Sequence, residues 1–302
     1  MRAEKRRVFA VWRAQLYVQR ASELIPEQDR RWSGSGARFP EVIRALNRME
    51  KDGVVIKDAD VPGLYHYEDS APSPDDKLVA PAGLSSSEYE VLMEAHPFAA
   101  LSHFSALMFH GLTNEFSNAI HLVIPATGRA DQVPIGVERE ESDMLPYMPT
   151  HTPSTIRGRR VVWHRRRRKA WFGVATYRSG ESPLRVVNPQ RSLVDGLANP
   201  ESCGGIVVVL RSWRDFARHM DVDTLIEYAD MLDSMLQRQR VGYVLSELGV
   251  DHPKFEKWKS NAKRGGSNRL VAAEPFSSVF SEEWKISLNG PVEILHETPD
   301  EP

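Results

Sequence analysis

The amino-acid sequence predicts an α+β fold, with a small N-terminal part followed by a larger mixed α/β C-terminal region. Three observations lead to this prediction. Residues 38–67 combine the apolar spacing of a helix with two short strand-like segments. Residues 71–86 are rich in Pro, Ser and Asp, a composition typical of a linker. Helix-like and strand-like segments then follow over residues 87–295, enough for one or two subdomains, before an acidic tail at 296–302.

A first helix is expected over residues 4–24, because apolar residues recur there at helical spacing. The segment 26–37 accommodates only a short helix before a stretch containing Gly34 and Gly36. The expected inward-facing residues of the first helix are Val8, Trp12, Leu16 and Tyr17.

A second helix is expected near residue 40, with one apolar and one basic side. Pro40 suits the first helical position, since its missing N–H would be unpaired there. Glu41 places negative charge at the positive end of the helix dipole, and Gly53 can end the helix in a left-handed conformation. The apolar side carries Val42, Ile43, Leu46 and Met49, and the opposite side carries Arg44, Asn47, Arg48 and Lys51.

Two short strands are predicted after this helix, at 54–57 and 64–67, joined by a turn that contains Pro62 and Gly63. A helix with Arg and Asn outward, followed by a hairpin, is typical of a winged helix-turn-helix over residues 1–70, with the helix at base edges and the wing on phosphates. The alternative is the basic side of an ordinary solvated helix. The expected contacts with double-stranded DNA are Arg38, Arg44, Asn47, Arg48 and Lys51 on the helix, and Lys57 and His66 on the wing.

Local patterns define the expected elements of the second part. The Asn188–Pro189 pair suits a turn, after which Arg191 and Asp195 can pair one helical turn apart. The apolar run IVVVL at 206–210 indicates a strand buried on both faces, and residues 126–150 indicate irregular connections. Helices are expected at 87–95, 102–110 and over most of 221–249, and strands at 119–125, 161–164, 174–177, 184–187 and 284–288.

Composition narrows the class of protein. The 302 residues are 41% hydrophobic and 26% charged, as in an ordinary globular protein. No apolar run is long enough to span a bilayer, and the N-terminus lacks the apolar stretch of a signal peptide. The single cysteine, Cys203, excludes an internal disulfide and fits a reducing, cytoplasmic location. A net charge of −2 means that any nucleic-acid-binding surface must be a local patch.

The densest charge feature is the segment IRGRRVVWHRRRRKAWFG, residues 156–173. Such runs usually form interaction surfaces for polyanions or acidic partners, and the interleaved Trp163, His164 and Trp171 offer planar faces for base stacking. The alternative is a solvated hairpin whose arginines pair with the acidic stretch 138–143 or with the tail. The residues expected to bind DNA, RNA or an acidic protein are Arg157, Arg159, Arg160, Arg165, Arg166, Arg167, Arg168 and Lys169.

No motif of a known enzyme class is present. The carboxylates Asp221 and Asp223 resemble a metal-binding pair, but the rest of a nucleotidyltransferase site is missing, and they are better placed to open a helix. Neither a GxxxxGK[ST] loop nor a GxSxG turn occurs. His103 and His110 have no Cys or carboxylate at ligand spacing. We therefore expect no enzyme activity, no metal site and no cofactor.

Four segments carry a family resemblance. They are LNRMEKDGVV with GLYHY (46–67), LSHFSALMFHGLTNEFSNAIHLVIP (101–125), PLRVVNPQRSLVDGLANPESCGGI (183–206), and RVGYVLSELGV with WKISLNG (240–290). Together and in this order, they resemble the AbiEi-type antitoxins, regulators of bacterial and archaeal abortive-infection systems. The resemblance covers nearly the whole chain.

The resemblance implies a type IV antitoxin encoded beside a nucleotidyltransferase toxin. Its N-terminal winged helix would repress its own operon at promoter repeats, and its C-terminal region would counter the toxin, directly or indirectly. Two rival hypotheses remain open. One is a winged-helix regulator whose second part senses a small ligand, and the other is an RNA-binding or nuclease-like protein that uses the arginine-rich segment.

Overall fold

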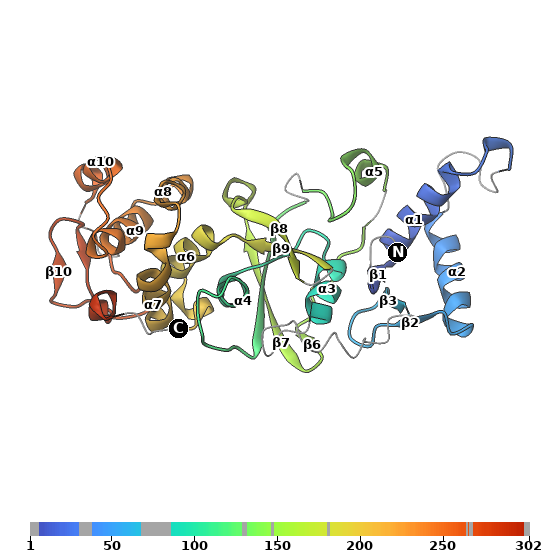
Figure 1. Cartoon of the computed structure of the whole chain (residues 1–302), viewed down its shortest axis with the longest axis horizontal. Coiled ribbons are helices and arrows are strands. Elements are labelled where there is room, and N and C mark those ends of the chain that lie inside the picture. The colour runs from blue at the N-terminus through green and yellow to red at the C-terminus, as the bar shows by residue number, and fades with distance from the viewer. Residues whose placement is uncertain are drawn as a thin grey trace. The chain divides into compact units, whose positions relative to one another are not determined.

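The structure, a computed structural model, describes residues 6–29, 38–67, 86–128, 132–145, 148–179, 182–263, 265 and 268–298. The chain is α+β and divides into two compact units (Figure 1). Unit 1 comprises Met1–Ala100, Ile124–Arg165 and Thr176–Arg185, and unit 2 comprises Leu101–Val123, Arg166–Ala175 and Val186–Pro302. The predicted linker up to residue 85, the glycines of 34–36 and the tail beyond 298 lie outside the described residues.

In the N-terminal module, residues 6–67, the described part of the chain forms two α-helices and a three-stranded antiparallel sheet of order β1-β3-β2. The helix expected from residue 4 was placed too early, because Val8–Ala10 forms strand β1, which pairs with Leu64, Tyr65 and His66 of β3. Trp12 and Leu16 of the helix are buried, as predicted. The elements are β1 (Val8–Ala10), α1 (Val11–Glu23), a 3-10 turn (Glu27–Asp29), α2 (Phe39–Lys51), β2 (Val55–Lys57) and β3 (Leu64–Tyr67).

Helix α2 and the β2–β3 hairpin form where the sequence predicted them. Glu41 accepts a hydrogen bond from the backbone N–H of Arg38 at 3.1 Å, which satisfies a donor at the start of the helix. Val42 and Leu46 are buried against Phe9 and Val11, so α1 and α2 share one small core. Gly53 follows the helix with φ of +70°, and Gly63 lies in the hairpin turn with φ of +77°. Both angles are in the left-handed region, which favours glycine.

Six further strands form one sheet of order β6-β7-β5-β4-β9-β8. Helix α5 (Arg139–Met144) corrects the expectation of irregular structure over 126–150. It begins where the backbone N–H of Glu138 donates to Glu141 at 2.9 Å. Helix α3 (Ser86–Ala95) confirms the helix expected at 87–95. The strands are β4 (Ala100–Leu101), β5 (Ala119–Pro125), β6 (Thr155–Ile156), β7 (Arg159–Arg166), β8 (Val174–Ser179) and β9 (Ser182–Val187).

Unit 2 is mainly helical. The run IVVVL does not form a strand, because it opens helix α7 (Ile206–Phe216), which buries Val209, Leu210 and Trp213 at helical spacing. The helical region 221–249 is confirmed as two helices, separated at Asp233 with φ of +52°. The elements are α4 (His103–Phe109), α6 (Pro189–Ala198), α7, α8 (Val222–Met231), α9 (Met235–Glu247), α10 (Lys254–Asn261), β10 (Phe280–Ser281) and β11 (Ile286–Ser287), with 3-10 turns at Pro200–Cys203 and Val292–His296.

The core of unit 2 includes the chain's single cysteine. Cys203 is buried with Leu107, Leu193 and Trp213, and this burial raises the pKa of its thiol well above the ordinary value. Within the described residues, no helix combines the length and the apolar character needed to cross a membrane.

Candidate nucleic-acid interface

Helix α2 presents its basic side to solvent. The side chains of Arg44, Arg48 and Lys51 are exposed, as is that of Arg38 just before the helix, whereas Asn47 is half-buried. Arg44 Nε lies 3.4 Å from the backbone oxygen of Pro40, one turn earlier on the helix. The opposite side of the helix packs on the core of the N-terminal module, so the cations form the outer side of a supported helix.

The two wing candidates have partners within the N-terminal module. Lys57 Nζ lies 2.5 Å from Glu50 Oε2 of α2, and the hydrogen bond to Glu50 raises the pKa of Lys57. His66 Nε2 lies 2.7 Å from Asp58 Oδ2. Burial opposes ionisation of Asp58, but hydrogen bonds from His66 and from backbone N–H groups outweigh it and lower the pKa of that carboxyl. Neither Lys57 nor His66 therefore offers a full uncompensated charge to a phosphate.

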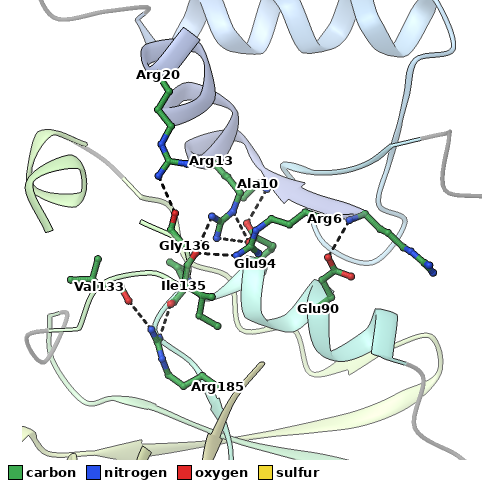
Figure 2. Close-up of polar contacts among 12 residues, drawn as sticks. Arg6, Ala10, Arg13, Arg20, Glu90, Glu94, Val133, Ile135, Gly136 and Arg185 are labelled. Atoms are coloured by element: carbon green, nitrogen blue, oxygen red, sulfur yellow. Dashed lines mark hydrogen bonds and ion pairs between the residues drawn. The ribbon is translucent and has the colours of Figure 1, made fainter. Parts of the chain in front are cut away.

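Two buried carboxylates of helix α3, Glu90 and Glu94, bind the start of the chain (Figure 2), and Glu90 accepts a hydrogen bond from the backbone N–H of Arg7 at 3.2 Å. Glu94 Oε1 accepts hydrogen bonds from Arg13 Nε at 2.7 Å and from Arg6 Nη1 at 3.0 Å, and Oε2 accepts one from the backbone N–H of Ala10 at 3.3 Å. The two guanidinium groups also donate to the backbone oxygen of Ile135, at 3.1 Å from Arg13 and 3.0 Å from Arg6. We call Arg6, Arg13 and Glu94 the Glu94 cluster.

Two more arginines fasten the segment that precedes and includes α5. Arg20 of α1 donates to Glu141 at 2.6 and 2.7 Å and to the backbone oxygen of Gly136 at 3.0 Å. Arg185 of β9 donates to the backbone oxygens of Pro97 and Val133, at 3.0 and 2.6 Å, and burial lowers its pKa to about 10 (Figure 2). Helix α1, against which α2 packs, is thereby held in place within unit 1.

Sequence reasoning missed the Glu94 cluster. Arg13 follows Trp12, which the sequence places on the inward face of the first helix. A cation at the edge of this apolar face was the one local sign of a buried ion pair. Its partner lies in another helix 81 residues further along the chain, and no spacing rule connects them.

The cations of the basic segment 156–173 differ in exposure. Arg159 pairs with Glu88 at 2.7 Å. Arg166 is buried and pairs with Asp195 at 2.5 Å, so the expectation that it meets a polyanion at the surface is corrected. Neither carboxylate belongs to the acidic stretches considered as partners, where Glu141 instead pairs with Arg20. The exposed cations are Arg157, Arg160, Arg165, Arg167, Arg168 and Lys169.

The tryptophan of this segment in strand β7 is built into the fold. The ring of Trp163 is half-buried, its Nε1 donates to the backbone oxygen of Pro153 at 2.7 Å, and its centroid lies 6.1 Å from that of His96. These contacts fix the orientation of the ring and reduce the area available for base stacking.

In unit 2, Asp195 bridges two arginines. Arg191 Nε donates to Oδ1 at 2.8 Å, which confirms the predicted pair one helical turn apart, and Arg166 occupies Oδ2. Burial alone would raise the pKa of Asp195, but the positive charges of Arg166 and Arg191 outweigh it and lower that pKa to about 2. The Arg191 guanidinium lies 3.9 Å from the ring centroid of Phe172. The motif PQRSLVDG is therefore architectural.

A polar cavity of about 400 Å³ lies in unit 1. Its wall includes His96, Arg165 and the hydroxyl-bearing Thr127, Thr150 and Thr152. Burial lowers the pKa of His96 to about 4, with a small opposing effect from its own backbone and a further lowering by the charge of Arg165. The imidazole is thus neutral at pH 7, and Arg165 supplies the positive charge of the cavity.

The carboxylates considered for metal chemistry have structural roles. Asp221 caps α8, accepting from the backbone N–H of Asp223 at 3.1 Å and from the hydroxyl of Thr224 at 2.6 Å, as expected for a helix start. His110 Nε2 lies 2.8 Å from the backbone oxygen of Val187. Over the described ranges, no group of three His, Cys, Asp or Glu side chains is arranged to hold a metal ion.

Comparisons with known proteins reveal a structural likeness but no family. No family model and no curated protein matches this chain. Its structure is similar to the crystal structure of the RV2827C protein from Mycobacterium tuberculosis, with a TM-score of 0.47 and 15% sequence identity, over 96% of this chain and 95% of that one.

Proposed function

We propose that this protein is a DNA-binding transcriptional autorepressor and the antitoxin of a type IV toxin–antitoxin pair whose toxin is a nucleotidyltransferase. The DNA-binding part of the proposal rests on one observation, the exposed cations Arg38, Arg44, Arg48 and Lys51 on a helix whose other side is buried. The antitoxin part rests on the resemblance of the four sequence segments to AbiEi-type antitoxins.

The connectivity of the N-terminal module supports a winged helix. Strand β1 comes first, helices α1 and α2 follow, and the β2–β3 hairpin comes last, with β3 in the centre of the sheet. A helix directly before such a hairpin is the one that a winged helix places in the major groove, while the hairpin rests beside the adjacent backbone. In this assignment α2 is the recognition helix and the β2–β3 hairpin is the wing.

Arg44, Arg48 and Lys51 are spaced to serve as one row. They follow one another at four and three residues, so they fall on one side of α2. Arginine reads guanine in the major groove by a bidentate pair of hydrogen bonds, and lysine binds phosphates as a point charge. Lys57 and His66 are assigned a smaller part, since Glu50 and Asp58 already engage them.

The test of DNA binding uses the chain's own promoter as a labelled duplex, measured by fluorescence anisotropy. We expect Arg48→Ala to weaken binding by about 1–3 kcal/mol if it contacts a base, and an Arg44→Ala/Arg48→Ala variant to lose more. Lys257→Ala removes an exposed cation of α10 and serves as the matched control. A double variant that binds like the wild type would eliminate α2 as the reader.

The test of antitoxin activity is growth rescue on co-expression with the adjacent gene product. The full chain is required, because deleting the N-terminal module would strip Glu94 of Arg6 and Arg13 and leave a buried carboxylate unpaired. We expect Arg44→Ala/Arg48→Ala to abolish repression while retaining rescue. If the adjacent gene product is toxic and neither the wild type nor the double variant restores growth, the antitoxin assignment is wrong.

A regulator that senses a small ligand is the second candidate function, and the cavity beside Arg165 favours it. A neutral imidazole, threonine hydroxyls and one guanidinium suit a small carboxylate or phosphate compound. Inorganic phosphate and simple dicarboxylates are suitable probes, assayed by thermal shift with Arg165→Met and with Arg160→Met as control. A ligand that stabilises the wild type but not Arg165→Met, and that changes promoter affinity, would favour this function.

A further inference from the structure

The hairpin between β6 and β7 has a turn with unusual residue choice. Ile156 and Arg159 are paired across the two antiparallel strands, so Arg157 and Gly158 alone form the turn. Both have left-handed backbone angles, with φ of +47° and +79°. This is the conformation of a type I′ turn, in which Asn, Asp or Gly normally occupies the first position.

Arginine at the first position has a conformational cost. The left-handed region is unfavourable for an L-residue with a Cβ, and arginine lacks the short polar group with which Asn or Asp offsets this cost. Arg157 is exposed, so burial of its side chain does not explain its presence. A residue kept in an unfavourable backbone region points to a role for its side chain.

The hairpin tip is joined to the wing. The backbone N–H of Arg157 donates to Asp60 Oδ2 at 2.8 Å, and Asp60 lies in the turn between β2 and β3. Arg159, next to the tip, is anchored on Glu88 of α3 at 2.7 Å. The hairpin is therefore held by one hydrogen bond to the wing turn and by one ion pair to α3, both within unit 1.

The acidic residues of the wing turn would oppose its approach to DNA unless the β6–β7 hairpin compensated their charge. It carries Asp58 and Asp60, whose negative charges would repel phosphates. Asp58 is engaged by His66 and by the backbone N–H groups of Asp60 and Val61. Asp60 is engaged by the hairpin, which brings the exposed Arg157 next to it and the exposed Arg160 a short distance along β7.

We propose that the β6–β7 hairpin tip is a second DNA-contacting element, which extends the wing and binds backbone phosphates through Arg157 and Arg160. The inference rests on the proposed DNA binding by α2. Because phosphates carry no base identity, the hairpin adds affinity and salt dependence but no sequence preference.

The key variant is Arg157→Asn, because it separates folding from binding. Asparagine suits the left-handed turn position, so the variant should unfold at the same or a higher temperature than the wild type. Loss of one phosphate contact should lower the slope of log affinity against log salt by about 0.9, and Arg157→Asn/Arg160→Gln should lower it by about 2. Discrimination between promoter and scrambled duplex should be unchanged.

Lys257→Gln is the matched control, and Arg44→Ala/Arg48→Ala the contrasting variant, which should lose sequence discrimination. Wild-type binding to promoter DNA with an unchanged salt slope in the double hairpin variant would overturn the hairpin inference and leave the role of α2 standing. A wild type that binds no duplex would overturn both. A slope change seen only with structured RNA would also overturn the assignment to DNA.

Discussion

Glu94 of α3 accepts a 2.7 Å hydrogen bond from Arg13 of α1, and the two side chains are only 1% and 2% exposed. The same carboxylate is shared with Arg6 and with the backbone of Ala10, at the junction between β1 and α1. An isolated charge in such surroundings is strongly disfavoured, so the partners depend on one another. The Glu94 cluster thereby joins the strand and helix at the start of the chain, on which α2 packs, to α3 in the second part of the sequence.

Replacing Glu94 by Gln should destabilise the protein by about 3–5 kcal/mol, because two buried guanidinium groups would lose their shared anion. Glu50→Gln is the control, since it removes a partner from the largely exposed pair with Lys57 and should destabilise the protein far less than Glu94→Gln. Urea unfolding of both variants and the wild type provides the comparison. Similar losses for the two variants would show that the Glu94 cluster contributes little.

His96 should make stability fall in mildly acidic solution. Its pKa in the folded protein is about 4, against an ordinary value of 6.5, so between these values the unfolded chain binds a proton that the folded chain does not. Stability should therefore decrease as pH falls from about 6.5 to 4, by up to about 1.4 kcal/mol per pH unit. Unfolding of the wild type and His96→Gln is compared across pH 4–8.

Above pH 7 the imidazole of His96 is neutral in the folded and the unfolded protein. The difference in stability between the wild type and His96→Gln at that pH therefore measures the loss of packing alone. The titration then appears as a shallower pH dependence of the variant below pH 6.5. Some slope should persist in the variant, since burial also lowers the pKa of His110. Parallel profiles over the whole range would contradict the assignment.

Gly242 of α9 should not tolerate even alanine. A Cβ at this position would overlap the ring of the buried Trp284, which packs directly on the helix backbone. Alanine favours a helix by up to about 1 kcal/mol over glycine, but the overlap should reverse the sign and destabilise by about 1–3 kcal/mol. Ser246→Ala on the same helix is the control and should be neutral. Trp284→Phe should recover part of the loss, whereas a Gly242→Ala protein as stable as the wild type would refute the overlap.

The basic segment should separate into structural and functional arginines. Arg167→Ala/Arg168→Ala changes exposed side chains and should reduce antitoxin rescue more than promoter binding, with little change in melting temperature. Arg166→Ala should instead destabilise the protein, since it removes one of two cations from the buried Asp195. Equal loss of rescue and promoter binding in the exposed double variant would mean that one surface serves both.

The sequence predicted elements whose signals are local. Helix α2 follows from Pro40, Glu41 and the apolar spacing, and the pair Arg191–Asp195 from its i,i+4 separation. Strand β1 escaped prediction because Val8–Ala10 continues a helical apolar pattern, and only pairing with β3 makes it extended. At Val8–Ala10 the local preference for a helix is outweighed by hydrogen bonding to strand β3, which lies more than fifty residues further along the chain.

Helix α7 was mistaken for a strand because β-branched residues favour strands. Trp213 and Ala217 continue the helical spacing that begins at Val209, so a longer window of sequence indicates a helix. The cations of α2 were identified by sequence alone, whereas the engagement of Arg166, Lys57 and His66 by carboxylates was not, because their partners are set by the tertiary fold.

Burial of Cys203, the chain's one cysteine, makes the protein suited to site-selective labelling. A protonated, enclosed thiol reacts slowly with maleimides, so a cysteine introduced at an exposed site would be modified almost alone. A fluorophore at position 157 and another on the duplex end would then report by energy transfer whether the hairpin turn approaches the double helix.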